Sequence, residues 1–118
     1  MSITLILASL LFSLSLSIGQ LLFKLAADDI KLKIAEGWLT AIISGWLFAA
    51  ILLYAVSTVL WVAILTQVNL SKAYPFALLG AALVPLISHY FLNEQLTFKY
   101  VIGMVLVLLG VLIIQKAT

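Results

Sequence analysis

The sequence predicts an all-α membrane protein whose four transmembrane helices form one small bundle. Of the 118 residues, 66% are hydrophobic and 8% are charged, whereas soluble domains contain about 25% charged residues. Mean hydropathy is +1.34. A helix needs about 20 apolar residues to cross a bilayer core, and the chain has four such runs, at 5–27, 38–65, 73–92 and 98–114. We therefore expect a single domain, 1–118, with helices at about 3–27, 37–65, 71–92 and 97–115.

The first apolar run carries a line of polar side chains, which fall within roughly 40° of one direction on a helix. They are Ser2, Ser9, Ser13, Ser17, Gln20 and Lys24. A serine hydroxyl can bond back to its own helix, but an amide and an ammonium in lipid need other partners. We therefore expect this face to bind substrate, although Lys24 alone could also snorkel to the interface. The candidate substrate ligands of this helix are Ser13, Ser17, Gln20 and Lys24.

A hydrophilic stretch, 28–37, follows the first run. Its alternation of apolar residues with lysines fits either a solvated connector or a short amphipathic segment on the membrane surface. Asp28 lies one helical turn beyond Lys24, so the two charges could neutralise each other. In the second run, Trp38 is expected to anchor the chain at the membrane interface. Trp61 could be another anchor or a wall of the substrate chamber.

The third run brings further candidate site residues. Lys72 supplies a second cation and Tyr74 an aromatic ring at the start of this run, and both are candidate site residues. Pro85 lies in the middle of the run, where its missing N–H produces either a hinge or a fixed bend. His89 follows one turn later and is either an interfacial hydrogen-bonding residue or part of the substrate site.

The fourth run contains two glycines seven residues apart, Gly103 and Gly110. Seven residues return to nearly the same side of a helix, so both glycines expose backbone on one face. Small residues allow close helix contacts in membranes. We expect this face to form a dimer contact, with an internal helix contact as the alternative.

Residue types and charge exclude several classes of function. There is no cysteine, and one histidine with four acidic residues leaves no plausible metal site. The net charge of +2 comes from dispersed lysines, which favours bilayer lipid rather than nucleic acid as a partner. We find no catalytic constellation, so we expect neither an enzyme nor a cofactor. A small excess of lysines near the first and third connectors weakly places these connectors in the cytoplasm.

Several motifs resemble the small multidrug resistance family of the drug/metabolite transporter superfamily. They are Gly19 with Lys24, Ala73-Tyr74, Ile102-Gly103-Met104 and 110–114. The resemblance covers essentially the whole chain and implies an antiparallel dimer around a shared chamber. Drug exporters of that family carry a membrane-embedded glutamate where this chain has Leu16, and a tryptophan where it has Ala77. The chain therefore lacks the acid and the aromatic wall of proton-coupled drug export.

A neighbouring branch, the subunits of the aminoarabinose phospho-undecaprenol flippase, is more similar. The shared motifs are Gly19-Gln20 with Lys24, Leu60-Trp61 with Leu65, Gln67-Val68 and Ala73-Tyr74-Pro75. The stretches 84–86 and 91–97 also resemble the EamA-type repeat unit of the wider superfamily. This branch implies movement of an undecaprenyl-phosphate-linked sugar across the bacterial inner membrane, for lipid A and envelope glycolipid modification. It also implies a homodimer, or a heterodimer with a related four-helix subunit.

The chemistry of the first helix agrees with such a substrate. An anionic phosphate joined to a polar sugar requires a cation and hydrogen-bond donors, which Lys24 and Gln20 supply. Two alternatives remain open. One is an exporter of small cationic drugs or metabolites, in which His89 or Glu94 replaces the missing acid. The other is an accessory membrane subunit that transports nothing.

Overall fold

The computed structural model describes residues 2–37 and 43–117, so the expected anchor Trp38 lies outside the described residues. Within these residues the chain forms four long helices: α1 (Ile3–Lys33), α3 (Gly45–Leu65), α4 (Leu70–Leu92) and α5 (Phe98–Ala117). A short 3-10 turn, η1 (Ile34–Glu36), follows α1. Each long helix is sufficiently long and apolar to cross a membrane. The prediction of an all-α membrane protein with four transmembrane helices is therefore confirmed.

Helix α1 continues beyond the expected end at about residue 27. Its 31 residues correspond to about 46 Å, which exceeds a hydrocarbon core of about 30 Å. The polar end stays helical because Lys24 pairs with Asp28 at 3.1 Å and Lys33 pairs with Asp29 at 3.2 Å, each one turn apart. Residues 28–33 of the hydrophilic stretch are thus part of α1. They form neither a coil connector nor a separate surface helix.

The described part of the second span begins at Gly45, after Ser44. The Ser44 hydroxyl accepts a hydrogen bond from the N–H of Leu47 at 3.4 Å, which is a standard helix cap. Gly37, where we expected this helix to begin, has φ 128° and is not helical. The helix therefore begins later than the apolar composition alone predicts.

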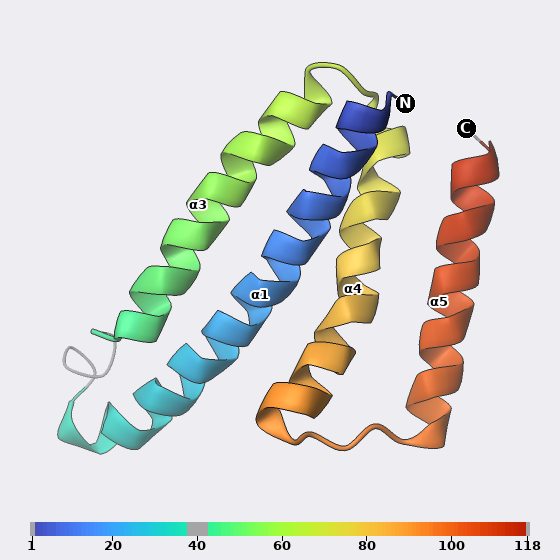
Figure 1. The fold of residues 1–118 in the computed structure, drawn as a ribbon. Coiled ribbons are helices and arrows are strands. Elements are labelled where there is room, and N and C mark those ends of the chain that lie inside the picture. The colour runs from blue at the N-terminus through green and yellow to red at the C-terminus, as the bar shows by residue number, and fades with distance from the viewer. Residues whose placement is uncertain (1, 38–42, 118) are drawn as a thin grey trace.

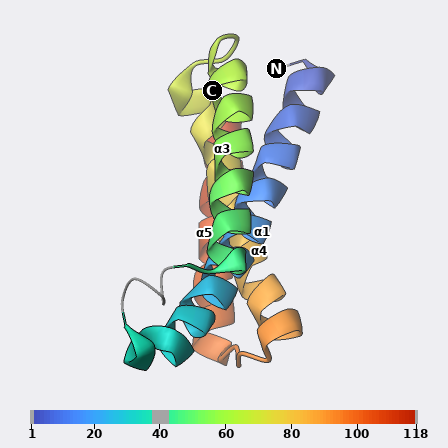
Figure 2. The ribbon, with the colours of Figure 1, turned by 90° about the vertical axis from the view of Figure 1, so that its left-hand side faces the viewer.

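The helices lie side by side in a flat array of 52 × 37 × 18 Å. Helix α1 lies between α3 and α4 and contacts both of them, whereas α5 stands beyond α4 (Figure 1). Figure 2 shows α1 and α4 crossing, so that their ends diverge. In the described part of the chain, α4 is the one helix that α5 contacts.

A small apolar core lies where α3 turns into α4, against the start of α1. Phe12, Ile64 and Ala73 are buried there. The rings of Phe12 and Trp61 stack at 4.6 Å between centroids and 19° between planes. This contact joins the first half of α1 to α3.

The two glycines of α5 have no close neighbour within the described chain. A Cβ atom added to Gly103 or Gly110 would meet open space. The face is therefore available for the dimer contact that the sequence predicts, and that contact stays a prediction.

Candidate substrate-binding site

The serines of α1 form its contact with α4. Ser13 and Ser17 are about 1% exposed. The Ser17 hydroxyl lies 2.9 Å from the Ser13 carbonyl and 3.3 Å from the Gly80 carbonyl, and the Ser13 hydroxyl donates to the Phe76 carbonyl. A Cβ at Gly80 would lie 3.3 Å from the Ser13 carbonyl, so glycine permits this close approach. The upper part of the polar line thus packs two helices together, and headgroup binding by Ser13 stays a prediction.

Tyr54 of α3 lies directly on Gly19 of α1. Its phenol oxygen accepts a hydrogen bond from Gln20 Nε2 at 2.5 Å, and its ring meets the edge of Phe23 at 5.0 Å. A Cβ at Gly19 would be 2.6 Å from Tyr54 Cε2. The sequence analysis missed Tyr54 as a site residue. A hydroxyl in the middle of an apolar span was the available signal, because such a group needs a partner in lipid.

Below this contact, α1, α4 and α5 enclose a polar cavity of about 280 Å³. We call it the polar pocket and define it by its polar lining residues. These are Ser17, Gln20, Lys24, Ser88, Glu94 and Tyr100. An overlapping cavity of about 380 Å³ extends it toward Tyr54. Three of the predicted ligands, Ser17, Gln20 and Lys24, therefore line one cavity.

Lys24 is the cation of the polar pocket. About half of its side chain is exposed, and its ammonium contacts Asp28. The predicted pairing of these two residues is confirmed. Exposed ion pairs of this kind contribute only about 0–1 kcal/mol, so a stronger anion could replace Asp28 at little cost.

The connector between α4 and α5 holds Glu94 at the same cavity. Asn93 ends α4 in the left-handed conformation, with φ 55°. The N–H of Glu94 then donates to the Ser88 carbonyl at 3.3 Å, and His89 Nδ1 lies 2.9 Å from the Glu94 carbonyl. Because a carbonyl oxygen can only accept, this contact requires a proton on Nδ1. His89 lines a separate outer cavity with Glu94 instead of the polar pocket.

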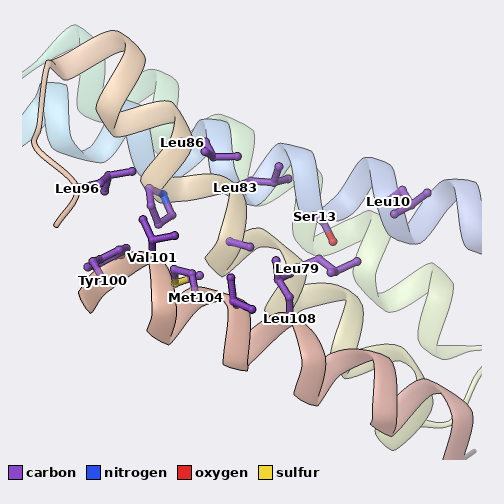
Figure 3. Close-up of a pocket in the computed structure, with 13 residues that line it drawn as sticks. Leu10, Ser13, Leu79, Leu83, Leu86, Leu96, Tyr100, Val101, Met104 and Leu108 are labelled. Carbon is purple, nitrogen blue, oxygen red and sulfur yellow. The ribbon is translucent and has the colours of Figure 1, made fainter. Parts of the chain in front are cut away.

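An apolar groove of about 470 Å³ adjoins the polar pocket between α4 and α5 (Figure 3). Its walls include Leu79, Leu83, Leu86, Met104 and Leu108. The groove and the polar pocket share Pro85 and Tyr100. Helix α4 continues through Pro85, so this residue serves as a common wall, and hinge motion there stays a prediction. The polar pocket and the apolar groove are thus neighbours with two wall residues in common, and we call the pair the crevice.

The remaining predicted ligands lie at the other end of the bundle. Trp61, stacked on Phe12, also meets the ring of Tyr74 at 6.5 Å between centroids. Lys72 is in the first turn of α4, and its carbonyl accepts a bond from Gln115 Nε2 at 3.4 Å. None of these three residues lines the polar pocket. The structure thus divides the candidate residues into two groups at opposite ends of α1.

Curated proteins of similar length align with the whole chain. A protein of Pseudomonas paraeruginosa, named a probable 4-amino-4-deoxy-L-arabinose-phosphoundecaprenol flippase subunit ArnE, is 30% identical over 98% of both chains. This chain belongs to the ArnE family. A Pseudomonas aeruginosa protein of the same name is 29% identical over 99% of both chains. A Hamiltonella defensa member is 33% identical over 48% of this chain and 51% of its own length.

The family membership confirms the resemblance to flippase subunits, and the four spans agree with a multi-pass protein of the bacterial inner membrane. The relatives are named for transport rather than for catalysis. No protein-family model matches the chain. No solved structure matches it either.

Proposed function

We propose that this protein is a flippase subunit that moves an undecaprenyl-phosphate-linked aminoarabinose between the leaflets of the inner membrane. The observation that supports this most is the crevice, because its polar pocket and its apolar groove meet at Pro85 and Tyr100. An amphiphilic lipid has the same division into a polar headgroup and an apolar chain. The names of the relatives supply the sugar and the polyprenol.

In this proposal the polar pocket binds the headgroup. Lys24 exchanges its contact with Asp28 for the phosphate, which carries more charge and more acceptor oxygens. Gln20, already oriented by Tyr54 at 2.5 Å, retains a second N–H for a sugar hydroxyl. Ser17 lies at the upper limit of this pocket, where its hydroxyl is committed to carbonyls.

The prenyl chain follows the apolar groove between α4 and α5. Because a lipid tail is as apolar as the leucines that line the groove, entry of the chain costs little and gains little. The groove therefore guides the chain, whereas the headgroup contacts determine recognition. Trp61, Lys72 and Tyr74 would meet the headgroup only at the opposite end of its path.

Lys31, Lys33 and Lys99 are carried by the end of the bundle where α1 ends and α5 begins. From the bias of lysines toward the cytoplasmic side, we infer that this end faces the cytoplasm. The headgroup is then loaded from the cytoplasmic leaflet and released in the periplasmic leaflet.

The relatives are named subunits, which implies a further chain in the working assembly. We propose that the glycine face of α5, which is open at Gly103 and Gly110, contacts that chain. The partner is a second copy or a related four-helix subunit.

The function can be tested in vesicles that contain the purified protein and its partner. Lipid-linked aminoarabinose is added to the membrane, and the fraction of headgroups reached by a membrane-impermeant amine reagent is followed over time. Faster exposure than in protein-free vesicles is the expected result. An exposure rate equal to that of protein-free vesicles, for protein that is folded and correctly assembled, contradicts the proposal.

One observation also favours a second function, the export of small cations. Glu94 lines the polar pocket and could attract a cation without any lipid tail. This version predicts uptake of a soluble organic cation into the same vesicles when a proton gradient is imposed. The flippase proposal predicts none.

A further inference from the structure

The polar pocket contains one positive and one negative side chain that are not paired with each other. Lys24 comes from the lower part of α1, and Glu94 comes from the connector between α4 and α5. Among the described residues, ion pairs join only Lys24 to Asp28 and Lys33 to Asp29. The Glu94 carboxylate therefore remains available to a ligand.

The connector fixes the position from which Glu94 extends. Its main chain is held on both sides, by the N–H bond to Ser88 and by the contact of His89 with its carbonyl. The hydroxyl of Thr97 accepts a bond from the N–H of Tyr100 at 3.2 Å, which caps the start of α5. These contacts fix the main chain of Glu94, a residue that lines the polar pocket together with residues of α1.

We propose that Glu94 binds the protonated amino group of the sugar while Lys24 binds the phosphate, so that the polar pocket recognises a zwitterionic headgroup. This inference rests on the proposed function. A 4-amino-4-deoxy sugar linked through its phosphate carries its positive charge across the ring from its negative charge. Lys24, on α1, and Glu94, in the connector between α4 and α5, line the same pocket from different elements and supply the two complementary charges. Gln20, Ser88 and Tyr100 also line the pocket, and in this proposal they meet the hydroxyl groups of the sugar.

Lys24 and Glu94 should affect the binding of two related lipids differently. Both an amino sugar and its N-acetylated form carry the phosphate, but only the amino sugar carries a cation. Lys24 should therefore contribute equally to the binding of both lipids, whereas Glu94 should contribute to one of them. A solvated Glu94 with no ligand would affect neither.

The test is equilibrium binding of the two undecaprenyl-phosphate-linked sugars, amino and N-acetylated, to the full-length protein in lipid nanodiscs. The wild-type protein should prefer the amino sugar by about tenfold or more, as a charge-assisted hydrogen bond implies. Glu94→Gln keeps the shape of the side chain and should abolish this preference. Glu94→Asp keeps the charge and should retain part of it. Lys24→Gln should weaken both lipids to the same extent.

Glu36→Gln is the matched control, because Glu36 lies in the turn after α1, outside the polar pocket. It should leave the preference unchanged. Equal binding of the two lipids by the wild-type protein overturns the inference, as does a preference that survives in Glu94→Gln. Failure of the lipid to change leaflets in vesicles would instead contradict the proposed function, since binding is measured without transport.

Discussion

Tyr54 lies against Gly19 so closely that a Cβ atom on the glycine would be 2.6 Å from Tyr54 Cε2. This contact joins α3 to α1 in the apolar part of the bundle, and it turns the Tyr54 hydroxyl toward Gln20. The same ring is held from the side by Phe23. Tyr54 thus packs against Gly19 and also holds the candidate ligand Gln20 in position.

Gly19→Ala should displace the Tyr54 ring and separate its hydroxyl from Gln20. We expect a loss of stability of about 1–3 kcal/mol, as is typical of overpacked contacts, together with weaker lipid binding. Thermal unfolding in detergent and the nanodisc binding assay measure the two effects. Gly45→Ala is the control, because an added Cβ there meets open space. Equal behaviour of the two variants would contradict the contact.

Tyr54→Phe should isolate the effect of the hydroxyl from that of packing. The ring can keep its contacts with Gly19 and Phe23, but Gln20 loses its acceptor. A neutral hydrogen bond contributes about 0.5–1.5 kcal/mol, which corresponds to a several-fold loss of lipid affinity with little change in unfolding temperature. Tyr90→Phe, at a side chain 76% exposed, should change neither quantity. Unchanged lipid affinity in Tyr54→Phe would show that the Tyr54 hydroxyl does not orient Gln20 for binding.

Gly80→Leu should force α4 away from α1. The leucine side chain would meet the Ser13 carbonyl and the Ser17 hydroxyl, which lie 3.3 and 3.5 Å from the Cβ position. Overpacking of a buried helix contact costs about 1–3 kcal/mol or more, so the unfolding temperature should fall. An unfolding temperature equal to that of the wild-type protein would show that the two helices are not in close contact.

Gly103→Leu, in contrast to Gly80→Leu, should leave the unfolding temperature of the protomer unchanged. A Cβ atom at this position meets no atom of the described chain within 4 Å, so we expect the fold of the protomer to survive. If the glycine face of α5 is the dimer contact, the variant should shift toward the monomer, as measured by the mass of the detergent-solubilised protein. A dimer fraction equal to that of the wild-type protein would exclude Gly103 from the contact.

Leu83→Trp should fill part of the apolar groove. We expect slower transport of the long-chain lipid, whereas a short-chain analogue with the same headgroup should be less affected. Leu106→Trp is the control, because Leu106 is 64% exposed and does not line the groove. Slowing by the same factor for both chain lengths would indicate that the groove does not guide the prenyl chain.

The sequence was sufficient to predict the number and type of the long helices, because each apolar run matches the thickness of a bilayer. It also predicted the pairing of Lys24 with Asp28, since residues four apart on a helix are neighbours. The end of α1 could not be predicted from hydropathy. Charge pairs between 24 and 33 extend the helix beyond its apolar run.

The candidate site was only partly predictable. The helical period of the polar line grouped Ser17, Gln20 and Lys24, and these three residues line one cavity. The period of a single helix cannot tell which part of a line faces a neighbouring helix, so the packing role of the serines was not foreseen. Tertiary packing likewise separates Trp61 and Lys72 from the polar pocket, although their residue types suggested a shared site.

The central claim is that the polar pocket binds the phosphate of a lipid-linked sugar through Lys24. The most direct measurement is the rate at which vesicles containing the protein and its partner expose the headgroup of lipid-linked aminoarabinose, compared between the wild-type protein and Lys24→Ala. Lys31→Ala, a lysine of the same helix outside the pocket, is the control. A charge-assisted contact contributes about 1.5–3 kcal/mol, so the rate at low lipid concentration should fall about tenfold or more in Lys24→Ala and stay near wild type in Lys31→Ala. A Lys24→Ala rate equal to that of an active wild-type protein would contradict the claim.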